Sequence, residues 1–141
     1  MSDDGVLHIP ADVNELAGIR QFVREHAVRA GADRQQTDDL VQAVDESATN
    51  SIVHGYRGTE GWVEVEIDVL DRALVVRLRD QAPPFDPTTL PDPDISLPLE
   101  RRPFHGLGVF LARELTDEVT YRHTTAGNEL TLTKLIRNRG R

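Results

Sequence analysis

The feature that most constrains the fold is a strict alternation of apolar and charged residues over two consecutive segments. Such a period of two predicts β-strands, because successive side chains of a strand point to opposite faces. The apolar positions are Val63, Val65, Ile67, Val69, Leu74, Val76 and Leu78. The charged positions between them are Glu64, Glu66, Asp68, Arg77 and Arg79. A turn near Asp71 and Arg72 joins the segments, so the sequence predicts an antiparallel hairpin with one buried face and one face in water.

The charges on the water face have a simple interpretation. Acids of the first strand can lie opposite arginines of the second, and exposed pairs of this kind mostly form a solvated surface. We assign no further function to them from the sequence.

The remaining segments predict helices on one side of this sheet. Asp12 with Glu15 and Asp33 with Gln36 are capping-box patterns that precede helical periodicity. Strands are expected at 6–9, 119–123 and 130–136, with a turn at 125–128, and helices at 12–30, 33–56 and 104–115. The expected fold is therefore an α+β two-layer sandwich, in which a mainly antiparallel sheet of about five strands is covered on one face by about three helices.

The chain of 141 residues is expected to form one domain, at 6–136. Residues 1–5 are expected to be a disordered N-terminus and 137–141 a basic tail. The segment 81–103 is irregular and holds seven of the eight prolines. So long an irregular stretch inside a small domain is either disordered or functional, and we expect a lid at about 86–105.

Composition excludes several classes of protein. The chain has 16 Lys plus Arg against 24 Asp plus Glu, a net charge of −8, which argues against a nucleic-acid binder. It has no cysteine, so disulfides and thiolate metal sites are excluded. No apolar run resembles a signal peptide or a membrane span, and we expect a cytoplasmic protein with no membrane partner.

The central helix carries the first candidate site. Glu46, Asn50 and His54 recur at helical spacing on one side, with Asp39 and Ala43 just below them. The apolar stripe lies on roughly the opposite side, at Val41, Val44, Ala48 and Ile52. An Asn oxygen suits Mg²⁺, and a glutamate one turn away can take a proton from a nucleophile beside it. For His54 the simpler interpretation is a histidine packed at a helix end.

Two further clusters follow along the chain. Asp80 ends a predicted strand, where it can accept a hydrogen bond from an exocyclic amine or simply form a turn before the prolines. Gly106-Leu107-Gly108 begins a predicted helix, where free backbone N–H groups can approach a phosphate. Three preceding side chains could meet a terminal phosphate: Arg101, Arg102 and His105.

The order of these clusters resembles the GHKL ATPases, which have the Bergerat or histidine-kinase-like ATP-binding fold. Within that superfamily the chain resembles the anti-sigma-factor serine kinases of bacterial partner switching, over residues 6–136. Asp45–Tyr56 is similar to the family's Glu-Ala-x-Thr-Asn-Ala-x-x-His form, and Pro84–Pro87 and Gly106–Ala112 also match.

The resemblance implies ATP and Mg²⁺ as cofactors, a serine on a STAS-type anti-anti-sigma factor as substrate, and a sigma factor as an alternative partner. It also makes a homodimer an expectation. Glu46 would be the general base, Asn50 the Mg²⁺ ligand and Asp80 the adenine-binding carboxylate, with Gly106, Leu107 and Gly108 as the phosphate loop. Ala82 belongs to the nucleotide-binding turn, although the family usually has glycine there, and the wider superfamily has glycine near Pro84.

Two alternatives use the same residues. In the first, the domain is a nucleotide-binding module that sequesters a regulator without turnover. In the second, it is a simple ATPase, with water as the nucleophile in place of a serine. The presence of Glu46 favours turnover, because sequestration alone needs no base.

Overall fold

In the part of the chain that the structure describes, five strands form one antiparallel sheet with the spatial order β1-β2-β3-β5-β4. The computed structural model describes residues 5–83 and 112–136. The strands are β1 (Val6–Pro10), β2 (Trp62–Leu70), β3 (Ala73–Asp80), β4 (Glu118–Thr124) and β5 (Gly127–Leu135). The predicted α+β class and the hairpin of β2 with β3 are confirmed. The expectations for the two termini, for the lid at 86–105 and for the Gly106–Gly108 loop lie outside the described residues.

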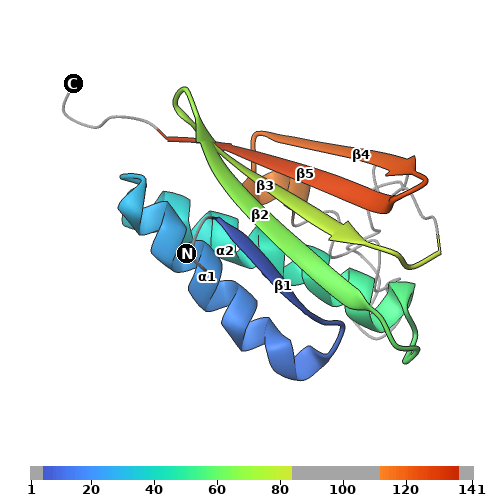
Figure 1. The fold of residues 1–141 in the computed structure, drawn as a ribbon. Coiled ribbons are helices and arrows are strands. Elements are labelled where there is room, and N and C mark those ends of the chain that lie inside the picture. The colour runs from blue at the N-terminus through green and yellow to red at the C-terminus, as the bar shows by residue number, and fades with distance from the viewer. Residues whose placement is uncertain (1–4, 84–111, 137–141) are drawn as a thin grey trace, which may run out of the picture.

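Helices cover one face of the sheet (Figure 1). They are a 3-10 turn η1 (Val13–Glu15), α1 (Leu16–Arg29), α2 (Arg34–Thr49) and a π-helical turn η2 (Asn50–Gly55), and residues 112–115 are also helical. The capping box predicted at Asp33 is confirmed, since its carboxylate accepts from the Gln36 N–H at 2.7 Å while Gln36 Oε1 accepts from the Asp33 N–H at 2.8 Å. Asp12, by contrast, caps only the 3-10 turn, and α1 begins at Leu16.

The core lies between the helices and the sheet. The predicted apolar stripe of the central helix is buried there: Val41, Val44, Ala48 and Ile52. It packs in one cluster with Val63, Val65 and Ile67 of β2 and with Leu74, Val76 and Leu78 of β3. Val69, predicted on the buried face, is exposed near the end of β2. The alternation in the sequence thus assigns the correct face of each strand to the core.

The central helix differs from the prediction in two ways. It does not stay α-helical to residue 56, because the backbone changes to a π-helical turn at Asn50, and the Tyr56 N–H donates to the Ser51 carbonyl. Ala43 is fully buried, although the sequence predicted it beside Glu46, Asn50 and His54. Asp39 forms an ion pair with Lys134 of β5 at 3.2 Å. The reason is that α2 packs against α1 as well as the sheet, which widens its buried arc.

Strand β5 begins earlier than predicted. The sequence predicts a turn over 125–128, whereas β5 starts at Gly127 and its second residue, Asn128, pairs with Asp80 of β3. Gly127 has φ of +121°, and a Cβ there would lie 2.2 Å from the Asp80 carbonyl oxygen. Only glycine allows the two backbones to approach so closely. This position therefore brings β5 against the end of β3.

The face of the sheet away from the helices carries a row of charges across the strands. Arg79 of β3 reaches Glu64 at 3.2 Å, Glu66 at 2.8 Å and Glu129 of β5 at 2.8 Å. Arg122 of β4 pairs with Glu129 at 2.6 Å. Burial alone would raise the pKa of Glu129, but hydrogen bonds from Arg122 and Arg79 outweigh burial and lower that pKa below its ordinary value of 4.5. Glu129 therefore stabilises the fold as a carboxylate.

We predict that Glu129→Gln lowers the free energy of unfolding at pH 7 by about 1 to 2 kcal/mol, because two charge-assisted hydrogen bonds are weakened. Since the pKa is lowered on folding, this stabilisation is fully present above 4.5 and is lost as the pH falls through the lowered pKa. Urea unfolding of the wild type and of Glu129→Gln, from pH 7 downward, measures the difference in the free energy of unfolding. Glu118→Gln, at the exposed start of β4, is the control and should change little. A difference independent of pH would contradict the prediction.

Candidate functional site

Asp80 is a buried carboxylate at the end of β3, with 6% of its surface exposed. It accepts hydrogen bonds from Ser51 Oγ at 2.7 Å, the Ala82 N–H at 3.0 Å and Asn128 Nδ2 at 2.8 Å. A carboxylate offers about four acceptor positions, so the described residues leave one, on Oδ2. The turn-forming interpretation of Asp80 is true in part, because its side chain holds the Ala82 N–H. The remaining acceptor position leaves it free to bind one further donor.

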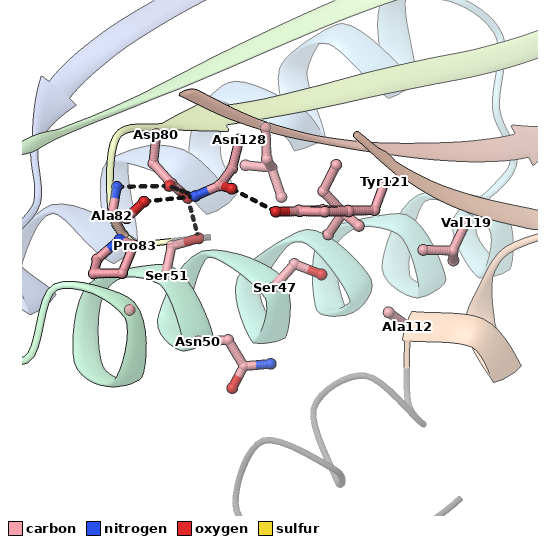
Figure 2. Close-up of a pocket in the computed structure, with 13 residues that line it drawn as sticks. Ser47, Asn50, Ser51, Asp80, Ala82, Pro83, Ala112, Val119, Tyr121 and Asn128 are labelled. Carbon is pink, nitrogen blue, oxygen red and sulfur yellow. Dashed lines mark hydrogen bonds between the residues drawn. The ribbon is translucent and has the colours of Figure 1, made fainter. Parts of the chain in front are cut away.

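A pocket lies beside Asp80, between the sheet and the central helix (Figure 2). Asn50, Asp80 and Ala82 are the sequence-predicted residues that line it. The other described residues of the lining are Ser47, Ser51, Gly55, Leu78, Pro83, Ala112, Val119, Tyr121, Asn128 and Leu130. Its wall is mostly apolar, and Ser51, Tyr121 and Asn128 gather around Asp80 while Asn50 lies apart from them. An apolar slot with one directed acceptor is suited to a flat heterocycle with an exocyclic amine.

Sequence reasoning missed Ser51, Tyr121 and the role of Asn128. Asn128 Nδ2 donates both to Asp80 and to the Ala82 carbonyl oxygen at 2.9 Å, and Tyr121 Oη donates to Asn128 Oδ1 at 2.6 Å. One signal was present: Gly127 before an Asn allows a strand to start with a close approach. No local pattern indicated which strand Asn128 would pair with.

Asn50 stands where α2 changes to η2. Figure 2 shows its amide at the opposite border of the pocket from Asn128. Its Oδ1 is buried and accepts no hydrogen bond from the described residues. Those residues contain no group of three or more acidic or histidine side chains that could hold a metal ion. A single free amide oxygen fits Mg²⁺ held mainly by water and substrate phosphates, and does not fit a cation caged by protein ligands.

Glu46 lies one turn before Asn50 and is partly buried. Burial raises its pKa above the ordinary 4.5, and the neighbouring Asp45 carboxylate raises that pKa further. Asp45 itself is paired with Arg20 of α1 at 2.9 Å. Glu46 is not among the described residues that line the pocket.

His54 is partly buried in η2 and does not line the pocket among the described residues. His54 follows Asn50 by four residues within the same π-helical turn. The phosphate-binding candidates Arg101, Arg102, His105 and Gly106–Gly108 lie outside the described residues.

Ala82 is buried against the π-helical turn. A Cβ built on Gly55 would lie 3.1 Å from the Ala82 Cβ, closer than side chains normally pack. The methyl group of Ala82, where the resembling family usually has glycine, is thus accommodated by a glycine on the facing helix.

None of the helices in the described part of the chain has both the length and the apolar composition that a membrane span requires.

Comparisons with known proteins show the family to which this chain belongs. A family model described as histidine kinase-like ATPase domain matches residues 9–134. The Serine-protein kinase RsbW of Bacillus cereus strain AH820 is 29% identical over 134 residues, which is 92% of this chain and 83% of that protein. The RsbW of Bacillus thuringiensis strain Al Hakam has the same identity and coverage.

A crystal structure of the RsbU and RsbW domains of Rv1364c from Mycobacterium tuberculosis has the same fold, with a TM-score of 0.63 and 22% identity. The match covers 96% of this chain and 34% of that longer one.

We predict that Gly55 and Ala82 are energetically coupled. Gly55→Ala should lower the free energy of unfolding by about 1 to 3 kcal/mol, because the new methyl group collides with Ala82. Adding Ala82→Gly should restore most of this loss, since the collision is removed. Urea unfolding of both single variants and the double variant measures the coupling. Additive effects would show that the two side chains do not compete for space.

Proposed function

Because the chain belongs to the histidine kinase-like ATPase family, we propose that it is an ATP-dependent protein serine/threonine kinase of a partner-switching system. Its substrate would be a serine of a STAS-type anti-anti-sigma factor, and in the alternative complex it would sequester a sigma factor. The names of its relatives support the serine kinase assignment. The observation that carries the proposal is the pair of Asp80 and Asn50 at opposite borders of one apolar pocket.

Asp80 would bind the adenine amino group. Its carboxylate is held by Ser51, Ala82 and Asn128, and the remaining acceptor position on Oδ2 suits a single N–H donor. The apolar wall that Leu78 and Leu130 contribute would contact the faces of the base. An acceptor-only group at this position favours a base with an amine over one with a carbonyl oxygen.

Asn50 would hold Mg²⁺ through its free Oδ1. When bound, the ion neutralises charge on the transferring phosphoryl group. The protein contributes position: α2 and η2 carry Glu46 and Asn50 on one continuous helical segment, so base and metal ligand keep a constant separation. Arg101, Arg102, His105 and the loop of Gly106, Leu107 and Gly108 would complete the phosphate site.

Glu46 would accept the proton of the serine hydroxyl. A carboxylate whose pKa is raised is a stronger base, and burial followed by Asp45 raises the pKa of Glu46. Glu46 is not among the described residues that line the pocket, which suits a group that would meet an incoming protein chain rather than the nucleotide. A module that only sequesters its partner would not need this base.

We expect Asp80→Asn to weaken ATP binding about tenfold or more, because the amide presents an N–H group towards the base amine. Asn50→Ala should remove the Mg²⁺ dependence of ATP binding while the fold survives. Calorimetric titration with ATP, with and without Mg²⁺, measures both effects. Asn14→Ala, at an exposed position in η1, is the matched control for Asn50. Equal Mg²⁺ dependence in the wild type and Asn50→Ala would remove Asn50 from the site.

We predict that Glu46→Gln lowers kcat by about 10²- to 10⁴-fold with little change in ATP affinity, since general base catalysis is lost. Glu46 works when deprotonated, so wild-type activity should rise with pH through a pKa above 4.5. The glutamine variant should lack this acid limb. Glu25→Gln on α1 is the exposed control. Unchanged kcat in Glu46→Gln would overturn the assignment of the base.

A radiolabelled-ATP assay with a STAS protein separates the three functions. Phosphate on a serine of the STAS protein supports the kinase. Release of inorganic phosphate alone indicates a simple ATPase, and ATP binding without turnover indicates a sequestering module.

A further inference from the structure

We propose that Asn128 is a positioning residue that makes the pocket selective for a purine carrying a 6-amino group, by locking the Asp80 carboxylate and the Ala82 carbonyl in one arrangement. The inference rests on the proposed nucleotide-binding function. It adds a residue that does not itself touch the base and that acts through Asp80.

The backbone places Asn128 directly opposite Asp80. The two are register partners in the pairing of β3 with β5, and both side chains face the helices. The approach depends on Gly127, because a side chain there would overlap the Asp80 carbonyl. The short separation lets one amide reach across to Asp80 and also to the following turn.

Every hydrogen-bonding position of the Asn128 amide is used by the described residues. Nδ2 donates to Asp80 Oδ1 at 2.8 Å and to the Ala82 carbonyl at 2.9 Å. Both partners are acceptors only, so the orientation of the amide is determined and Oδ1 must face the other way. There it accepts from Tyr121 Oη at 2.6 Å, and His123 Nδ1 lies within hydrogen-bond distance of it, at 3.1 Å.

A saturated amide cannot bind the base without breaking one of these contacts. Its effect is instead on Asp80, whose Oδ1 receives both Asn128 and the Ala82 N–H. Oδ2 receives Ser51 from the opposite layer of the fold. The carboxylate is therefore held from the sheet, the turn and the helix, and only its last acceptor position is left for a ligand.

Selectivity follows from this constraint. A carboxylate that can rotate can accept hydrogen bonds from donors in different positions. A carboxylate held in one orientation binds well only a donor at a single position. Loss of Asn128 should release Asp80 Oδ1 and the Ala82 carbonyl together. The pocket would keep its apolar walls, so general affinity for a purine should fall less than the preference for the amine.

The first test uses nucleotide-free protein. The Ala82 N–H is buried and bonded to Asp80 Oδ1, so its hydrogen exchange reports whether the carboxylate is held. We expect Asn128→Ala to accelerate exchange of this amide about tenfold or more. Thr131→Ala, on the same strand but on the opposite face, is the matched control and should leave it unchanged. Equal exchange in all three proteins would overturn the inference.

The second test compares ATP with purine riboside triphosphate, which lacks only the 6-amino group. In the wild type we expect ATP to bind about tenfold more tightly or better. In Asn128→Ala the ratio of the two dissociation constants should fall towards one. Tyr121→Phe, which removes one donor to Asn128 Oδ1 and keeps the ring, should reduce the ratio by a smaller factor, and it decides the question if Asn128→Ala does not fold.

The outcomes separate the two proposals. Weaker binding of both nucleotides by the same factor would make Asn128 merely structural and overturn this inference, while the nucleotide site stands. A wild type that binds neither nucleotide would overturn the proposed function and this inference together.

Discussion

The site depends on the hydrogen bonds that keep one buried carboxylate in place. A buried charge without donors costs several kcal/mol, so Asp80 is tolerable only where other segments supply donors to it. Three do: Ser51 from the π-helical turn, the Ala82 N–H from the turn after β3, and Asn128 from β5. These segments are also the borders of the pocket. The group that would bind a nucleotide is thus the group to which the helix, the turn and the sheet each donate a hydrogen bond.

The charged face of the sheet supports the same arrangement from the other side. Side chains alternate along a strand, so the register that pairs Asp80 with Asn128 also pairs Arg79 with Glu129 on the opposite face. A slip of one residue would separate both pairs. The ion pairs on the water face therefore depend on the same register as the pocket.

Much of the fold was predictable because its signals are local. The alternation over β2 and β3, the apolar stripe of α2 and the capping box at Asp33 were all confirmed. Asp80 and Asn50 were predicted as site residues, and the structure places them on one pocket. The π-helical turn, which directs Ser51 towards Asp80, was missed because no residue pattern distinguishes it from a continuing α-helix.

The sequence by itself determined which residues form strands and helices and which faces are buried, because these depend on periodicity within a few residues. It also determined the chemical groups available for the site. Only the tertiary structure decided that Asn128 meets Asp80 across 48 residues, that Gly55 leaves room for Ala82, and that Tyr121 orients the Asn128 amide. The first two contacts join segments far apart in the chain, and the third depends on the register of the hairpin of β4 with β5. Their partners are selected by sheet order, register and close packing, which no local pattern encodes.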